Sequence, residues 1–309
     1  MPELPEVETV RLGLSDYLTG ASIRAVEILD ERSLKRHLAG PKDFVKTLAD
    51  ARILGVVRRG KFLWMPLELS NGETGLALVG HLGMSGQMLI RDGGATPDKL
   101  TRIVMHVEGA NSEDLEFRFV DQRIFGSLQI DELVLTSDGF AGGYSASVGD
   151  GQPWLNQIPR SAAHIARDPL DVDFDENVVL AKFKKKNSGI KRVLLDQGVL
   201  SGIGNIYADE ALWASKIHYD HPANLLSSAK ARELLAEVRS VLAKAVLAGG
   251  TSFDEQYKNV NGESGYFEVS LNAYGQTSKP CNRCGKPIKR DAWMNRGSHF
   301  CPNCQKLPR

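Results

Sequence analysis

Residues 281–304 read CNRCGKPIKRDAWMNRGSHFCPNC and contain all four cysteines of this 309-residue chain. Two C-x2-C pairs separated by sixteen residues are typical of a four-thiolate zinc site. Because so short a segment has too small a core to fold alone, metal binding would supply its folding energy. Two disulfides or a redox C-x-x-C are the alternatives, and we expect zinc because no export signal is expected and no other cysteine exists. The predicted ligands are Cys281, Cys284, Cys301 and Cys304.

The charge distribution points to a nucleic-acid partner. The whole chain is neutral, with 38 basic and 38 acidic residues, but residues 1–179 carry a net −9 and residues 180–309 a net +9. Such asymmetry favours one basic face for phosphates, although chance clustering on a solvated surface would look the same. Arg296, in a turn-like Asn-Arg-Gly sequence, could present its guanidinium to a phosphate or could simply be solvated.

The region before the cysteines is predicted to be helical, and the region before that to consist of strands. Residues 3–18 form a predicted helix. Short alternating runs between about 22 and 131 indicate a β-sandwich, and 52–69 is typical of two strands joined at Arg59-Gly60. Polar, Gly-rich runs at 92–99 and 109–114 indicate surface loops. Apolar residues then recur at helical spacing in Val178–Lys185, Lys191–Leu195, Ile206–Ser215 and Ala229–Leu247.

The expected class is an α+β multidomain protein. Residues 1–135 form the N-terminal helix and β-sandwich, 136–152 have the composition of a linker, 153–275 are helical, and 276–309 form a β-hairpin zinc finger. No run of 18 apolar residues and no signal-peptide pattern is found. We therefore expect a cytoplasmic protein without membrane association.

The opening MPELPEVETV carries unusual chemistry. Removal of Met1 would leave Pro2 as a free secondary amine, and an α-amino group has a pKa of about 7.7–8. A nearby helix N-terminus would lower that pKa, so that a usable fraction is neutral and nucleophilic near pH 7. The adjacent Glu3 could move protons. On the residues alone, an inert N-terminal proline is the alternative.

Motifs along nearly the whole chain resemble the bacterial formamidopyrimidine-DNA glycosylases of the Fpg/MutM family. The opening MPELPEVE separates the chain from the endonuclease VIII branch, which favours oxidised pyrimidines and is the rival within the class. The further motifs are RRGKFL at 58–63, HLGMSG at 81–86, DQRIFG at 121–126, DPL at 168–170, LLDQGVLSGIGNIYADEAL at 194–212, GYF at 265–267 and AYG at 273–275.

The resemblance implies a bifunctional glycosylase and abasic-site lyase that removes 8-oxoguanine and formamidopyrimidines through a Schiff base and β,δ-elimination. Pro2 would attack C1′ of the flipped-out lesion nucleotide, Glu3 would deliver the proton that opens the deoxyribose ring, and Glu6 would support them. Lys61 would contact the flanking phosphate. A non-catalytic lesion-binding protein is the rival from another class, and the intact Pro2-Glu3 pair argues against it.

The resemblance also implies how DNA is held. Asn205, in a helix–two-turn–helix, and Arg296 would hold phosphates, and Asn205 suits a helix N-cap at an anion site. Spacing alone would favour an ordinary capped turn there. Met84, Arg123 and Phe125 would fill the gap left by the everted base, whereas apolar character alone would place two of them in a core. The partner is duplex DNA with oxidised bases, held between the two halves of a monomer associated with the bacterial nucleoid.

The chain also departs from the family pattern. The strand motif usually reads DPR followed by a basic residue, but Ile124 follows Arg123 here. Extra length near 92–114 and 136–152 is acidic and is expected to lie away from DNA. Residues 251–257 occupy the position of the loop that caps the flipped base, and no base contacts are assigned to them. His81, His106 and the other histidines are expected to be structural or solvated. One structural zinc, with no catalytic metal or redox cofactor, is expected.

Overall fold

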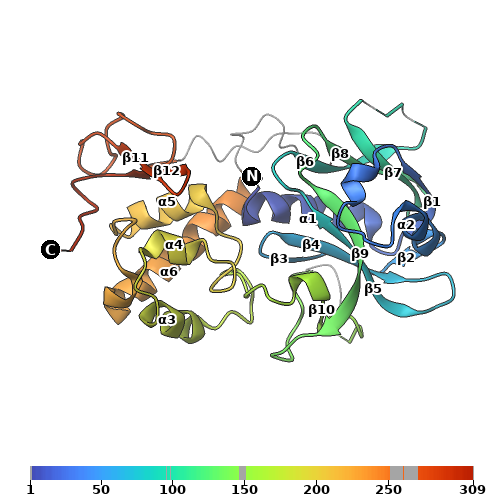
Figure 1. Cartoon of the computed structure of the whole chain (residues 1–309), viewed down its shortest axis with the longest axis horizontal. Helices are drawn as coiled ribbons and strands as arrows, with labels where there is room; N and C mark the ends of the chain where they lie inside the picture. Colours follow the sequence, from blue (N-terminus) through green and yellow to red (C-terminus); the bar gives the residue numbers. More distant parts are fainter. Residues whose placement is uncertain are drawn as a thin grey trace. The chain divides into compact units, whose positions relative to one another are not determined.

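The computed structural model describes residues 2–94, 96–97, 99–145, 151–250, 260 and 271–308. These residues form two compact units (Figure 1). The first contains Pro2, Glu6–His164 and Val260, and the second contains Glu3–Pro5, Ile165–Gly250 and residues 271–308. The GYF motif and the predicted base-capping loop at 251–257 lie outside the described residues.

Helix α1 (Leu4–Leu18) confirms the helix predicted over 3–18. Its buried residues Val7, Val10, Leu14 and Leu18 belong to the core of the first unit, as their helical spacing predicts. Leu4, at the start of the helix, instead packs in the core of the second unit.

An antiparallel sheet of ten strands makes up most of the first unit. The strands run in the order β10-β9-β5-β4-β2-β1-β7-β8-β6, with β3 paired to β4. Their bounds are β1 (Ser22–Ile28), β2 (Arg52–Ile53), β3 (Val57–Arg59), β4 (Phe62–Glu68), β5 (Thr74–His81), β6 (Gly86–Asp92), β7 (Thr101–Glu108), β8 (Asp114–Asp121), β9 (Ser127–Leu135) and β10 (Gln157–Pro159). The unit also contains η1 (Glu31–Leu34), α2 (Pro41–Leu48) and η2 (Arg160–Ala162).

The predicted β-sandwich is confirmed because the sheet curls back on itself. Met65 on β4 and Phe117 on β8 share one apolar core with α1. A Cβ on Gly80 of β5 would collide with the Met88 side chain of β6, although these strands are far apart in the strand order. The two halves of the sheet therefore face each other across one core, and Gly80 permits the close approach.

The stretch 52–69 contains three strands rather than the predicted two. Strand β2 ends at Ile53, although Leu54 still donates its N–H to Pro66 O of β4 at 2.9 Å, and β3 begins only at Val57. The β3–β4 hairpin then turns at Gly60-Lys61, one residue later than expected. The described residues of the predicted loops at 92–99 and 109–114 do lie between strands, apart from Asp92 and Asp114, which are strand ends.

The boundary between the units also differs from the expected linker at 136–152. Strand β10 pairs with β9, and Gly142 donates its N–H to Leu155 O at 2.6 Å. These hydrogen bonds keep residues 136–145 and 151–164 in the first unit, and the division falls between His164 and Ile165. Linker-like composition gave no sign of this pairing, because Gly and Ser are compatible with a surface strand edge as well as with a flexible connection.

The second unit is helical and ends in a hairpin. All four predicted helices are confirmed within two residues, and Asp175 and Ser227 cap the first and last of them. The elements are α3 (Glu176–Lys184), α4 (Ile190–Leu194), α5 (Asn205–Ala214), η3 (Ala223–Leu225), α6 (Ser228–Leu247), β11 (Lys289–Trp293) and β12 (Arg296–Phe300). Among the described residues, no helix has the length and apolar character needed to cross a membrane.

Candidate functional site

Glu3 caps the N-terminus of α5. Its Oε2 accepts hydrogen bonds from the N–H groups of Gly204 (2.7 Å) and Tyr207 (3.3 Å), and its Oε1 accepts one from Ile206 (2.9 Å). The side chain is only 3% exposed. A Cβ on Gly204 would overlap the Glu3 carboxyl group, so a larger residue there would have to displace the carboxylate. The helix terminus that the sequence marks as an anion site is therefore occupied by a carboxylate of the protein itself.

The backbone beside Glu3 is held by the same loop. Leu4 donates its N–H to Gly202 O at 2.9 Å, and Gly202 has a φ of +92°, a conformation that favours glycine. Pro2, the predicted nucleophile, is buried and directly precedes Glu3. Glu6, the predicted supporting acid, is buried in the first turn of α1.

Asn205 is not the N-cap that the sequence suggested. Gly204 is the N-cap residue, and Asn205 is the first residue of α5, because Glu3 has taken over the capping role. The Asn205 Nδ2 group instead donates to Gly297 O of β12 at 3.1 Å. Its Oδ1 is buried and has no hydrogen-bond partner within the described part of the chain. Asn205 therefore links α5 to the zinc-finger hairpin.

A buried ion pair makes the same link, and the sequence analysis missed it. Lys191 of α4 and Asp209 of α5 are both fully buried, with Lys191 Nζ 2.7 Å from Asp209 Oδ1. The ammonium also donates to Ser298 Oγ at 2.7 Å, and Asp209 Oδ2 accepts the His299 N–H at 2.8 Å. Burial lowers the pKa of Lys191, an effect that Asp209 partly offsets. Each helix carries two adjacent charged residues, Lys191-Arg192 and Asp209-Glu210, so the sequence does not single out the pair that meets.

Arg296 lies exposed at the start of β12 and pairs with Trp293. The predicted turn is shifted: Met294 and Asn295 form it, with φ of 44° and 59°, as expected for a two-residue hairpin turn with two positive φ angles. The Arg296 charge contributes to lowering the pKa of Lys191 and opposes the rise that burial causes in the pKa of Tyr274. Arg296 and Lys191 therefore belong to one basic cluster in the second unit, and Lys191 and Asn205 both donate to Gly297 O.

The four cysteines fit a zinc ion. Their Sγ atoms all lie within 4.8 Å of one another. Tetrahedral zinc with Zn–S bonds of about 2.3 Å places its sulfurs about 3.8 Å apart, which this cluster can accommodate. Trp213 of α5 donates its Nε1–H to Cys281 Sγ at 3.4 Å, which supports the thiolate from outside the cluster.

In the first unit, Asp121 brings together the loops that carry Met84, Arg123 and Phe125. These three are called the wedge residues here, because they are predicted to fill the gap left by the everted base. The fully buried Asp121 carboxylate accepts hydrogen bonds from Ser85 Oγ (2.5 Å) and from the N–H groups of Arg123 (3.1 Å) and Gly126 (2.7 Å). Ser85 follows Met84 directly, so one carboxylate fixes the Met84 turn and the Arg123–Phe125 loop. This role of Asp121 was not predicted, although an aspartate before a loop commonly accepts the N–H two residues on, as it does here from Arg123.

The wedge residues themselves do not form a core. Phe125 is 46% exposed, and the Arg123 guanidinium carbon lies 4.9 Å from the centre of its ring. Met84 is half-buried. Ile124 has a φ of +55°, which is unfavourable for a β-branched residue, and its carbonyl accepts a hydrogen bond from Lys35 Nζ at 2.7 Å. Lys35 thus brings a positive charge to the loop position where the family pattern has a basic residue.

Lys61 lies half-buried in the β3–β4 turn, and Gly60 before it has a φ of +57°. The next residue, Phe62, makes an edge contact with His81, with ring centres 5.9 Å apart. Burial lowers the pKa of His81 to about 4, with further contributions from Arg36 and Lys35. His81 is therefore neutral at pH 7, and its Nδ1 accepts the Gly83 N–H at 3.1 Å, beside Met84. The histidine expected to be structural or solvated supports the Met84 turn.

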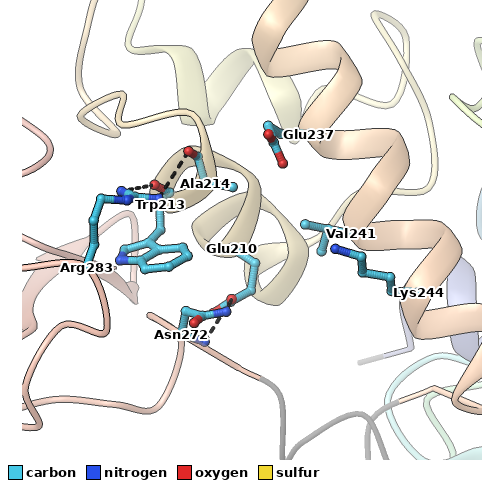
Figure 2. A pocket seen from close by; sticks show the side chains of 8 residues that line it. All are labelled: Glu210, Trp213, Ala214, Glu237, Val241, Lys244, Asn272 and Arg283. Atoms are coloured by element: carbon cyan, nitrogen blue, oxygen red, sulfur yellow. Dashed lines mark hydrogen bonds between the residues drawn. The ribbon is translucent and has the colours of Figure 1, made fainter.

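A cavity of about 370 Å³ lies in the second unit (Figure 2). The Arg283 guanidinium stacks on Trp213 at 4.2 Å, and the Glu210 carboxylate accepts the backbone N–H of Asn272, Ala273 and Tyr274. These contacts hold the segment leading into the zinc finger. None of the predicted site residues lines the cavity, whose walls are Glu210, Trp213, Ala214, Glu237, Val241, Lys244, Asn272 and Arg283.

Comparison with known proteins assigns each part of this architecture. Residues 1–128 match the formamidopyrimidine-DNA glycosylase N-terminal domain, 165–256 the H2TH domain of the same enzymes, and 278–307 the zinc finger found in FPG and IleRS. The architecture is thus that of a DNA glycosylase with a zinc finger. The chain belongs to the formamidopyrimidine-DNA glycosylase family.

Relatives and solved structures cover almost the whole chain. The formamidopyrimidine-DNA glycosylase of Leifsonia xyli is 53% identical over 99% of this chain and all of its own length. That of Streptomyces coelicolor is 47% identical over all of this chain and 99% of its own. The Lactococcus lactis Fpg in complex with abasic-site DNA is 30% identical, with a TM-score of 0.77 over 98% of this chain and 99% of its own. A mutant of that enzyme with Fapy-dG DNA gives 0.78 at 31% identity over 99% of this chain and 100% of its own.

Proposed function

We propose that this protein is a bifunctional DNA glycosylase and abasic-site lyase that excises oxidised purines from duplex DNA. It acts as a monomer in the bacterial cytoplasm on nucleoid DNA, with one structural zinc ion. The observation that carries the proposal is Glu3, whose carboxylate is held by three N–H groups at the start of α5 and directly follows Pro2. A group so held cannot swing away from the amine beside it, as proton transfer in a catalytic site requires.

Pro2 and Glu3 share the chemistry. After removal of Met1, the Pro2 nitrogen attacks C1′, the C1′–N bond to the base breaks, and the base leaves with the bonding electrons and takes up a proton. Glu3 supplies a proton to the ring oxygen as the sugar opens, which gives a cationic iminium. The iminium acidifies C2′–H, and loss of that proton breaks the bond from C3′ to its phosphate oxygen. Loss of a proton from C4′ then breaks the bond from C5′ to its phosphate oxygen. Water finally releases the proline.

The remaining site residues bind DNA. Lys61 contacts the phosphate beside the lesion, and Arg296 and Asn205 hold phosphates at the zinc-finger hairpin. The exposure of Arg296 and its shared cluster with Lys191 support this role. Met84, Arg123 and Phe125 occupy the space of the everted base, and the exposure of Phe125 supports that role.

The relatives support oxidised purines as the substrates, because they are formamidopyrimidine-DNA glycosylases. One Lactococcus lactis complex nevertheless contains an oxidised pyrimidine. Both classes of lesion therefore belong in the substrate assay, with 8-oxoguanine expected to be cut faster than thymine glycol.

Borohydride trapping tests the mechanism. Incubating the protein with an 8-oxoguanine:cytosine duplex and borohydride should reduce the iminium and yield a covalent adduct at Pro2. Pro2→Gly should lose most base excision and retain DNA binding, and a retained Met1 should abolish trapping. Pro41→Ala, a proline substitution at the start of α2, is the matched control and should trap normally. An adduct that maps to Lys61 or another lysine would overturn the assignment of Pro2.

A further inference from the structure

Residues 136–145 belong to a stretch for which the sequence suggests no purpose. In the structure, Tyr144 from this stretch forms an antiparallel bridge with Arg58 of β3. Tyr144 donates its N–H to Arg58 O at 2.8 Å and accepts the Arg58 N–H at 3.1 Å. A Cβ on Gly143 would lie 2.8 Å from Trp64 Cη2 and 2.9 Å from the Arg58 carbonyl carbon, so the stretch lies tightly against the hairpin. It therefore adds a short strand-like edge to β3.

A buried ion cluster lies beside this edge. Glu8 of α1 is within ion-pair distance of two guanidinium groups, with Oε1 2.8 Å from Arg11 Nη2 and Oε2 2.6 Å from Arg58 Nε. All three residues are at most 4% exposed. Tyr144 covers the cluster, because the Arg11 guanidinium carbon lies 5.1 Å from the centre of its ring. An aromatic ring in this position adds a cation–π attraction and keeps water from the ion pairs.

The cluster ends at the turn that carries Lys61. Arg58 Nη1 donates to Gly60 O at 3.2 Å, and Gly60 directly precedes Lys61 in the two-residue turn. A continuous series of contacts therefore runs from the Tyr144 ring through Arg11, Glu8 and Arg58 to the Gly60 carbonyl. Because Glu8 and Arg11 lie on α1, the series also fixes the Lys61 turn against the helix that follows Pro2 and Glu3.

We propose that Tyr144 is a positioning residue for Lys61: by pairing with β3 and covering the Glu8–Arg11–Arg58 cluster, it holds the Lys61 turn where its ammonium meets the DNA phosphate. The inference rests on the proposed function, since it takes Lys61 to be a phosphate contact. It gives residues 136–145 a role in the binding of DNA without requiring them to touch DNA.

A double-mutant cycle on DNA binding tests it. The probe is a duplex with a tetrahydrofuran abasic analogue, titrated at several salt concentrations with wild-type protein, Tyr144→Ala, Lys61→Ala and the double variant. Losing one phosphate contact reduces the slope of log K against log salt by about one unit. We expect Tyr144→Ala to reduce the slope in the same direction as Lys61→Ala. The double variant should bind within about twofold of Lys61→Ala alone, because both changes remove the same contact.

Three variants serve as controls. Tyr144→Phe keeps the ring and should restore wild-type slope and affinity. Tyr17→Ala removes a tyrosine of the same 38% exposure elsewhere in the unit and should leave both unchanged. Thermal melting identifies any variant that is unfolded at the assay temperature. If Tyr144→Ala is such a variant, Gly143→Ala replaces it, since the added methyl pushes the stretch away from Arg58 and Trp64 without removing a side chain.

The outcomes separate this inference from the proposed function. If Lys61→Ala binds like wild type at every salt concentration, the phosphate role of Lys61 is wrong and the inference fails with it. If Lys61→Ala weakens binding but Tyr144→Ala keeps the wild-type slope, or if the two effects simply add, then Lys61 keeps its role and the positioning role of Tyr144 is refuted.

Discussion

At the scale of single residues, the site is organised by buried charges whose partners lie far away in the chain. Glu3 is held by N–H groups of residues 204–207, Lys191 by Asp209 and residues of β12, and Glu8 by Arg58. An unpaired buried charge is costly, so each of these residues has a single acceptable arrangement. Such residues fix the geometry of the exposed side chains next to them, which are the ones proposed to contact DNA.

His81 leads to a prediction about pH. Its folded-state pKa of about 4 lies below the 6.5 of an unfolded histidine, so only the unfolded chain binds the proton between these values. Stability of the first unit should therefore fall as pH falls from 6.5 towards 4. His81→Asn, which can still accept the Gly83 N–H, should flatten the melting temperature against pH in this window by on the order of 5 °C. His106→Asn, at a more exposed histidine, is the control. Identical pH profiles for wild type and His81→Asn would contradict the prediction.

At the scale of elements, short loops and turns carry several of the predicted DNA-contacting side chains, and buried contacts hold these segments in place. The Arg123–Phe125 loop is held by Asp121 from inside and by Lys35 from outside, and the Met84 turn is joined to it through Ser85. The hairpin β11–β12 is likewise fixed by Lys191, Asn205 and Asp209. Rigid support from strands and helices lets these short segments present side chains at set positions.

The Arg123–Phe125 loop should also recognise the base opposite the lesion, through hydrogen bonds from Arg123. Cytosine offers O2 and N3 acceptors to the vacated space, which suit the Arg123 guanidinium, whereas adenine presents an N6 donor there. Arg123→Ala should slow excision of 8-oxoguanine opposite cytosine, by about tenfold if one charged hydrogen bond is lost, and should narrow the cytosine-over-adenine ratio. Cleavage of a preformed abasic site should suffer less. An unchanged ratio of rates opposite the two bases would refute the assignment.

At the scale of the whole molecule, separate cores allow the parts to be perturbed independently. The sandwich core, the helical core and the small cluster around the cysteines share no buried residue. The charge is divided as well: residues 180–309 carry the net +9, and apart from Val260 their described part lies in the second unit. Basic charge in the second unit suits phosphate contacts that weaken with salt.

Removing the zinc should therefore unfold only the finger. Cys301→Ser should abolish zinc content and lower DNA affinity by at least tenfold at moderate salt, because metal binding is the folding energy of the hairpin. The sandwich should still melt cooperatively at its usual temperature. Arg296→Ala is the matched control: zinc content should remain and the salt slope should fall by about one phosphate. Loss of the sandwich transition in Cys301→Ser would show that the finger is not an independent folding element.

Much of the fold can be predicted from patterns within short stretches of the sequence. The helical stripe of α1, the four helices of the second unit and the C-x2-C pairs depend on neighbours within a few residues, and all appear as predicted. The candidate residues Pro2, Glu3, Lys61 and Asn205 were likewise found from motifs, although their roles stay predictions.

Contacts between residues far apart in the chain could not be predicted from the sequence. Glu3 caps a helix about 200 residues away, which displaced Asn205 from the expected N-cap, and Tyr144 covers an ion cluster built from α1 and β3. A long-range contact also explains why the first unit extends to His164 and does not end at the expected linker, 136–152. Strand β10 pairs with β9, which ends at Leu135. A residue's own neighbours determine its local conformation, but which buried charge meets which partner is decided only when the chain has folded and desolvation makes every unpaired group costly.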